Sequence, residues 1–470
     1  MSFNNSDISL KKLVLRKLST PSMLAICFIV IFTMMTFKYW IWWNDFHHPF
    51  HNDVDQYYSY LVGLFIHHDL SFDFSHHFWL IKTPIGEVVP KVTMGIAILN
   101  LPFFIIGDNI AYVFDYAGDG YSAPYAWSIH FGAMFYAIVG FWYVRKTLLL
   151  FFSEWITAIS ILCILFATNL FYYTYREPEM SHSYLFFLSS VFLHNVIKWH
   201  NNQKIKHLYY LSFTAGFISL IRPTECLVLL FPLLYNVVSF KTLKENFLLF
   251  IKLKWKLLVA FLFFLLPIIP QMLYWKYYTG KFLFFSYGSQ EGFFFTDPRF
   301  YSVLFGWHKG WFVYTPMMFL VMVGLFLMFR KWKTLFFATV VYLALNIYLI
   351  SCWWDWGFGG AYGMRALVQS YAFLVFPLAY FFHYIFNVLT KKIIKVLAIS
   401  LTCCFTFIFI GLNIYHIKLF KSYCFHWDSN SKALYMYTLF ESNLDPKKCD
   451  SLFIHPDYTE MLKGNREEKE

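Results

Sequence analysis

A succession of long apolar runs is the feature that most constrains how this chain can fold. The first run, residues 22–43, can cross a bilayer as a helix, which takes about 20 residues. Only 14% of all residues are charged and 59% are hydrophobic, which excludes an ordinary soluble domain. We therefore predict an all-α integral membrane fold with about 11 transmembrane helices. The ten later runs lie near 124–144, 155–173, 183–199, 208–221, 225–240, 256–274, 312–329, 334–351, 366–389 and 396–416.

The basic residues assign a side to each loop. Placing the amino terminus and its basic residues at 11–17 in the cytoplasm puts 20 of the 38 Lys and Arg residues into short cytoplasmic loops. The acids agree, because only Asp7, Glu154 and Glu245 fall on that side and 27 − 3 = 24 lie outside. The net charge of +11 thus reflects topology and does not indicate a nucleic-acid partner. We expect a plasma (inner) membrane protein whose first run is an uncleaved anchor.

One apolar segment inside the long first outer loop, about 44–123, needs a separate interpretation. Val92–Ile106 is short and contains Pro102, and counting it as a span would move every later basic cluster outside. We therefore predict a re-entrant or interfacial helix there. The predicted domains are a transmembrane domain, 1–416, and a polar extracytoplasmic tail, 417–470, in which Cys424 and Cys449 could form a disulfide.

The candidate site residues all lie on the predicted outer side. Asp53 and Asp55 follow the first run, and they are either solvated loop acids or catalytic carboxylates. Arg222 interrupts an apolar stretch, where a charge costs about 2.5–3.5 kcal/mol even on insertion scales, so a functional role is the default. The alternative for Arg222 is a structural pair with Glu225. Arg365 is a functional cation or a snorkelling anchor at the start of a run.

The other polar residues extend this outer surface. Lys309 is followed by glycine and tryptophan, and no acid adjoins it, so it is a candidate anion contact. Arg176, Glu179 and His182 lie in and just after one short loop, and Glu291 precedes the aromatic run Phe293–Phe295. The centres of the apolar runs are almost free of ionisable groups, whereas a transporter keeps its polar groups near the bilayer midplane. The distribution favours an enzyme that acts at the outer surface on a lipid-borne substrate.

The order of these features resembles the GT-C superfamily of membrane glycosyltransferases. The resemblance is to the branch related to protein O-mannosyltransferases and the lipid A aminoarabinose transferase, and it covers about 45–370. The segments that carry it are Asp53 and Asp55 at the start of the outer loop, the amphipathic stretch Gln56–His68, Pro84–Gly86, Leu101–Phe103, Arg222–Thr224, Tyr274-Trp275, Thr279-Gly280, Lys309–Trp311 and Tyr314–Pro316.

The resemblance implies inverting transfer of a sugar from a polyprenyl-phosphate donor. It implies a first-loop carboxylate as catalytic base, which matches Asp53, with Asp55 as support. The chain has Asp-Val-Asp where the mannosyltransferases have adjacent Asp-Glu. The cations expected on the donor phosphate are Arg222, Arg365 and Lys309. The residues expected to hold the acceptor or sugar are Arg176, Glu179, His182 and Glu291.

No metal or other cofactor is required by this chemistry, because a sugar phosphate is already a competent leaving group. Asp53 and Asp55 could still hold a divalent cation. The acceptor could be a glycolipid, a glycan or a protein. Two alternative functions stay open, namely a lipid-linked glycan ligase or polymerase that uses a diphosphate donor, and a lipid flippase or transporter.

Overall fold

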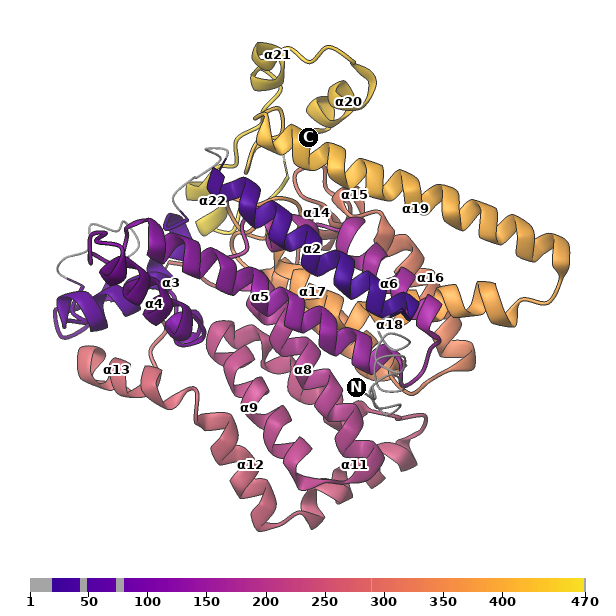
Figure 1. Cartoon of the computed structure of the whole chain (residues 1–470), viewed down its shortest axis with the longest axis horizontal. Coiled ribbons are helices and arrows are strands. Elements are labelled where there is room, and N and C mark those ends of the chain that lie inside the picture. The colour runs from indigo at the N-terminus through magenta and orange to yellow at the C-terminus, as the bar shows by residue number, and fades with distance from the viewer. Residues whose placement is uncertain (1–18, 43–48, 73–79, 289, 469–470) are drawn as a thin grey trace, which may run out of the picture.

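A computed structural model describes residues 19–42, 49–72, 80–288 and 290–468. The chain is 69% helical with almost no sheet, which confirms the all-α prediction. The basic residues predicted at 11–17 lie outside the described residues, as do parts of the predicted first outer loop. Figure 1 shows helices α2, α5, α8 and α9 gathered around a common core, with α19 extending along one side of it.

Each predicted apolar run overlaps one or more helical elements. In the first half these elements are α2 (Pro21–Trp42), α3 (Asn52–Val62), η1 (Gly63–His67), α4 (Gly95–Val113), α5 (Ala123–Leu148), α6 (Glu154–Phe166), α7 (Leu170–Tyr175), α8 (Ser181–Asn202), α9 (Ile205–Ile221), η2 (Pro223–Leu229) and α10 (Leu230–Leu234). Next come α11 (Phe240–Lys252), α12 (Trp255–Leu265), α13 (Ile269–Thr279), α14 (Phe300–Phe305), α15 (Trp311–Tyr314), α16 (Met317–Lys331), α17 (Phe336–Cys352), η3 (Arg365–Ser370), α18 (Tyr371–His383), η4 (Tyr384–Val388) and α19 (Lys392–Lys421). The last helices are α20 (Lys432–Phe440), α21 (Pro446–Asp450) and α22 (Tyr458–Leu462).

Among the described residues, fewer than the predicted 11 helices are by themselves long and apolar enough to cross a membrane. In the described part of the chain, five helices are long and apolar enough, or six if α12 and α13, bent by 59° at their junction, form one span. Several predicted runs form shorter apolar helices instead, such as α6 and α17. The count of about 11 transmembrane helices therefore remains a prediction.

Helix α4 is longer than the segment predicted at Val92–Ile106. It runs for 19 residues through Pro102 and is long enough to cross a membrane. Asp108 and Asn109 mark the end of the apolar run in the sequence, yet both lie inside the helix. The Tyr125 hydroxyl donates to Asp108, and the Asn109 amide donates to the Ile105 carbonyl at 2.7 Å. Both residues are exposed, so the helix continues past them without burying either polar side chain.

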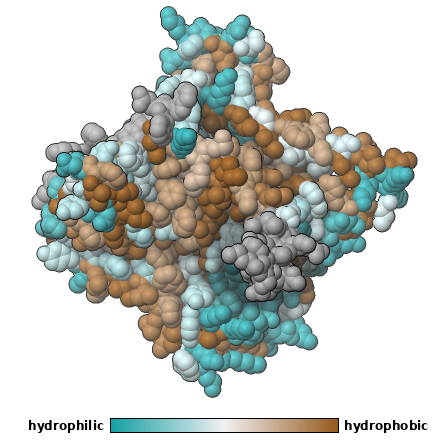
Figure 2. Space-filling model, viewed as in Figure 1, coloured by the Kyte–Doolittle hydropathy of each residue, from teal (hydrophilic) through white to brown (hydrophobic). Residues whose placement is uncertain are grey.

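The packing order explains where the core lies. Helix α5 packs on α4 and α8, α8 packs on α9, and α9 packs on α12. Helix α18 packs on α16 and α6, and its residues 371–382 are all buried. Helix α19 is mostly exposed along its length. Figure 2 shows apolar surface across the middle of the visible face, with polar surface at its upper and lower ends and at both side edges.

A short hairpin and a folded tail complete the molecule. Strands β1 (Leu80–Lys82) and β2 (Val88–Pro90) pair antiparallel, and the turn between them contains Gly86 at φ +97°, a conformation that glycine adopts without strain. The segment after α19 folds back onto the body. There the buried Arg466 guanidinium donates to the carbonyls of Ser351 and Trp353 at 3.1 and 2.8 Å.

The two tail cysteines lie side by side. The thiols of Cys424 and Cys449 are both buried, and they adjoin each other. We expect them to form a disulfide when the protein is made with the tail in an oxidising compartment. Intact mass spectrometry without reductant should show the mass of the chain lowered by about two hydrogens relative to the reduced sample. An unchanged mass would contradict an oxidising location for the tail.

Candidate active site

Helix α3 directs the side chains of Asp53 and Asp55, the two predicted carboxylates, to different sides. Asp53 and Asp55 both lie in its first turn, where the helix dipole stabilises negative charge. Residues two apart on a helix point to different sides. The Asp53 carboxylate lies 3.4 Å from Nη1 of Arg365, whereas Asp55 accepts from the Tyr121 hydroxyl at 3.4 Å. Asp53 is therefore the carboxylate that faces the basic residues.

The short 3-10 helix η3 holds two of the polar residues of the site. Arg365 at its start pairs with Asp53, and Gln369 four residues later donates to Glu225 at 2.6 Å. The buried Glu225 carboxylate also accepts from Tyr342 at 2.6 Å and from Asn346 at 3.0 Å. These three donors satisfy Glu225.

Arg222 lies at the break between α9 and η2. The following Pro223 cannot continue the helical hydrogen bonding, and Arg222 is extended at φ −140° and ψ 100°. Its guanidinium donates to the Ala366 carbonyl at 3.5 Å and lies 5.6 Å from the centre of the Phe358 ring. The alternative of a structural pair with Glu225 loses its basis, because other donors engage that carboxylate.

Two tyrosines lie near Asp53 and the two arginines of the site. Tyr57 and Tyr287 each interact electrostatically with Asp53, Arg222 and Arg365. Burial raises the pKa of both phenols above their ordinary value. Both hydroxyls therefore keep their protons at neutral pH and can donate hydrogen bonds.

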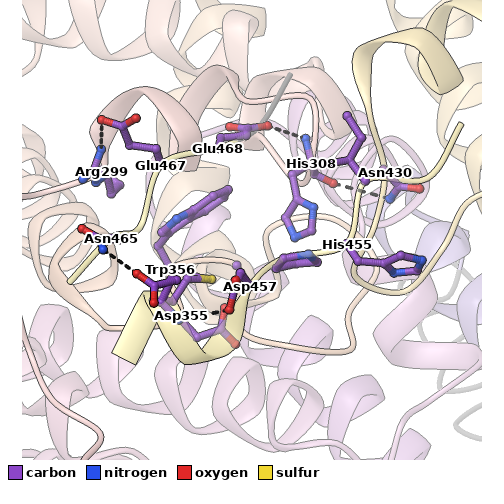
Figure 3. A pocket seen from close by; sticks show the side chains of 15 residues that line it. Arg299, His308, Asp355, Trp356, Asn430, His455, Asp457, Asn465, Glu467 and Glu468 are labelled. Carbon is purple, nitrogen blue, oxygen red and sulfur yellow. Dashed lines mark hydrogen bonds and ion pairs between the residues drawn. The ribbon is translucent and has the colours of Figure 1, made fainter. Parts of the chain in front are cut away.

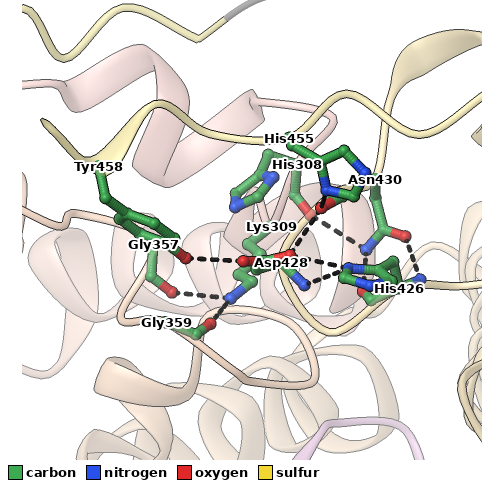
Figure 4. Close-up of polar contacts among 10 residues, drawn as sticks. His308, Lys309, Gly357, Gly359, His426, Asp428, Asn430, His455 and Tyr458 are labelled. Atoms are coloured by element: carbon green, nitrogen blue, oxygen red, sulfur yellow. Dashed lines mark hydrogen bonds and ion pairs between the residues drawn. The ribbon is translucent and has the colours of Figure 1, made fainter. Parts of the chain in front are cut away.

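Lys309 is buried and holds a loop. Its side chain is 1% exposed, and Nζ donates to the carbonyls of Gly357, at 3.1 Å, and Gly359. Figure 4 shows Lys309 reaching between these two glycines. Between them Phe358 adopts φ +57°, a strained conformation for a residue with a side chain. Lys309 therefore fixes the loop that carries the Phe358 ring to Arg222.

Replacing Lys309 by Met should loosen this loop and remove a pH-dependent term in stability. Burial lowers the pKa of Lys309 from 10.5 to about 7, although Asp355 opposes this shift. Between these pH values the unfolded chain binds a proton that the folded chain does not, so the free energy of unfolding rises with pH. Thermal unfolding at pH 7–10 should show this rise in the wild type and a smaller one in Lys309→Met. An equal rise of stability with pH in the wild type and in Lys309→Met would contradict a lowered pKa of the Lys309 amine.

The short loop after α7 places its two acids, Glu179 and Glu177, in different surroundings. Glu179 is 4% exposed and pairs with the His130 ring, inside the helix core. His182 is fully buried, with its ring centre 4.5 Å from that of Tyr173. Glu177, which had no predicted role, accepts from Tyr172 at 2.6 Å and interacts electrostatically with Arg365. Arg176 is partly buried in the same loop.

Glu291 belongs to a neighbouring cluster beside Tyr287. It forms an ion pair with Lys91 and accepts from Trp354 Nε1 at 2.9 Å. The Lys91 ammonium lies 4.9 Å from the centre of the Tyr287 ring. Glu291 therefore links the loop after β2 to the Trp353–Trp356 segment on one side of the site.

A cavity of about 460 Å³ lies between the tail and the loops that contain His308 and Asp355. Figure 3 shows its polar lining. Five of the side chains that line it are carboxylates, namely those of Asp355, Asp457, Glu460, Glu467 and Glu468. Asp355 also interacts electrostatically with Arg365 and Lys309, so it lies between the cavity and the basic residues. Burial raises the pKa of Asp355, and Lys309 opposes that rise.

No protein-family model and no curated protein matches this chain. Within the described part of the chain, no group of three or more His, Cys, Asp or Glu side chains is placed to hold a metal ion.

The structure adds residues that sequence reasoning did not assign. Tyr57, Tyr287 and Asp355 lie in stretches that were predicted to be on the outer side and are rich in polar and aromatic residues, but nothing in their spacing distinguished them from their neighbours. Phe358 and Glu177 also gave no sequence signal. Their roles depend on backbone conformation and on contacts with segments more than a hundred residues away.

Proposed function

We propose that this chain is a membrane glycosyltransferase of the GT-C type. It would move a sugar from a polyprenyl-phosphate donor to an acceptor hydroxyl, with inversion and without a metal. The observation that carries the proposal is the juxtaposition of a carboxylate, Asp53, with two arginines at the end of a helix bundle. A base beside an anion site is what such a transfer needs.

Arg365 has hydrogen-bonding capacity left for an anion. Its Nη1 lies near Asp53, while its Nε is buried and has no hydrogen-bond partner among the described residues. A buried donor without a partner costs about 1–3 kcal/mol, so a ligand acceptor there is favoured. A phosphate oxygen suits it, because a guanidinium presents several donors in one plane.

The transfer can be written with named roles. Asp53 accepts the proton of the acceptor hydroxyl as its oxygen forms a bond to the anomeric carbon. The bond between that carbon and the phosphate oxygen breaks, and the electron pair leaves with the lipid phosphate. Arg365 and Arg222 stabilise the added charge on the phosphate. Lys309 acts one step away, through the loop that seats Phe358 against Arg222.

The acid-lined cavity supports an acceptor rich in hydroxyl or amino groups. Carboxylates accept hydrogen bonds from such groups and repel phosphate, whereas the arginines attract phosphate. Donor and acceptor would thus occupy sites of opposite charge, on the two sides of Asp355.

The proposed topology follows the charge counts. About 11 membrane passes would place the amino terminus and the basic loops in the cytoplasm, and α3, η3 and the tail outside. Helix α4 would then lie within the outer loop. The membrane would be the plasma (inner) membrane, where polyprenyl-phosphate donors face outward.

The direct test is to incubate the purified protein with a panel of polyprenyl-phosphate monosaccharides and candidate acceptors. We expect release of lipid phosphate that depends on both donor and acceptor. Transport of the intact lipid across vesicles, with no release from any donor, would support the flippase alternative instead. Release from diphosphate donors alone would support a ligase or polymerase.

A further inference from the structure

Helix α11 differs from the other long helices in having no buried residue. It connects α10 to α12 and begins with a capping box, in which the Ser239 hydroxyl accepts from the Thr242 amide at 3.3 Å. Figure 1 shows it at the lower end of the bundle, away from α3 and α22. Its position is therefore defined although it is not part of the core.

One side of α11 is held by the bundle. The Asn246 amide donates to the carbonyls of Leu233 and Tyr235 at 2.9 and 2.8 Å. The Phe250 ring lies 4.8 Å from that of Trp199 on α8. These contacts fix the rotation of the helix, so the direction of its remaining side chains is set.

The adjacent stripe of α11 is apolar and exposed. Phe240, Phe247 and Ile251 are 81%, 57% and 54% exposed, and their spacing of seven and four places them on one face. Trp255, just beyond the helix, is 65% exposed. An exposed stripe of this kind on a fixed helix requires an apolar environment.

The charges around this stripe select the environment. Lys241 and Lys252 are exposed beside this face, and Lys244, four residues after Phe240, is exposed within it. The long Lys244 side chain covers apolar surface with its methylene groups and can still extend its ammonium to the headgroups. Lys254 and Lys256 follow the helix, whereas Glu245 is the single acid of α11. A helix with one apolar face, lysines beside it and a terminal tryptophan has the properties of a helix that lies in a membrane interface. The lysines are complementary to anionic headgroups.

We propose that α11 lies in the plane of an anionic phospholipid surface, with Phe240, Phe247 and Ile251 among the upper acyl chains and the lysines on headgroup phosphates. This site is separate from the arginines near Asp53, so the proposal does not depend on the proposed function.

A depth measurement on the full chain tests the apolar half of the proposal. After the exposed Cys226, Cys403 and Cys404 are replaced by Ser, a fluorescent label is attached in Phe247→Cys or Glu245→Cys. In vesicles with brominated acyl chains, the label at 247 should be quenched more strongly than the label at 245. Ile251→Cys repeats the test if Phe247→Cys does not fold. Equal quenching at both positions, as expected if a second copy or another protein covers the stripe, would overturn the proposal.

A lipid-retention measurement tests the charged half. Native mass spectrometry of the wild type should show phosphatidylglycerol retained in preference to phosphatidylcholine. The triple variant Lys241→Gln/Lys244→Gln/Lys252→Gln should lose this preference, by about fivefold for each lysine. The matched control, Lys421→Gln/Lys447→Gln/Lys448→Gln in the tail, should keep it. If both triple variants lost the preference equally, the preference would depend on net charge alone, and the assignment to α11 would be overturned.

Discussion

Replacing Asp53 by Asn should reduce sugar transfer by about 10²–10⁴-fold, the contribution of a positioned general base. The amide keeps the shape of the side chain but does not accept the proton of the acceptor hydroxyl. Donor binding should persist or tighten, because Arg365 loses its 3.4 Å partner and the negative charge beside the phosphate site disappears. The measurements are release of lipid phosphate and the equilibrium binding of labelled donor.

Asp55→Asn is the matched control for this prediction. It removes the same charge from the same helical turn, but its carboxylate accepts from Tyr121 and does not face Arg365. We expect a loss within about tenfold, which corresponds to one hydrogen bond. Wild-type transfer by Asp53→Asn, or a larger loss in Asp55→Asn, would remove Asp53 as the base.

Replacing Arg365 by Ala should weaken donor binding by about 10- to 100-fold, the range for a hydrogen bond to a charged group. The effect should appear as an increase in the donor KM, together with a lower kcat because the charge on the leaving phosphate grows in the transition state. Arg365→Lys should recover part of the binding, since it restores charge without the planar donor set.

Two comparisons distinguish a phosphate contact from a general loss of positive charge. Arg330→Ala removes an exposed arginine at the end of α16 and should leave the donor KM unchanged. The double variant Asp53→Asn/Arg365→Ala should be less impaired than the product of the two single effects, because the two side chains contact each other. If the two losses of transfer activity simply multiplied, so that their free energies were additive, the result would contradict a shared site. Arg222→Ala should also raise the donor KM, and lost activity at an unchanged KM would count against its phosphate role.

Sequence reasoning was accurate where apolar length decides the outcome. The run at 22–43 became α2, and the run at 396–416 lies inside α19, because an apolar run of this length is most stable as a helix. It was less accurate where polar residues end an apolar run. At α4 the exposed Asp108 and Asn109 end the apolar run but not the helix, because a helix can continue through exposed polar residues.

For the candidate site, too, the sequence predicted some features and the structure added others. From the order of residues alone, Asp53, Arg222 and Arg365 could be selected, since a charge beside an apolar run is costly and therefore informative. The expectation that Asp53 is the base came from the resemblance, and the structure adds that the Asp53 carboxylate lies beside Arg365 whereas Asp55 accepts from Tyr121. The role of Lys309 came from its burial against the Gly357 and Gly359 carbonyls.

The apolar runs by themselves determined that this chain is an all-α protein built for lipid, because helix formation and insertion depend on local length and composition. Only the tertiary structure decided which polar residues meet. Asp53 and Arg365 are more than three hundred residues apart, and their contact depends on how α3 and η3 pack into one bundle. Such packing is fixed by the summed contacts of the whole core and not by any local pattern.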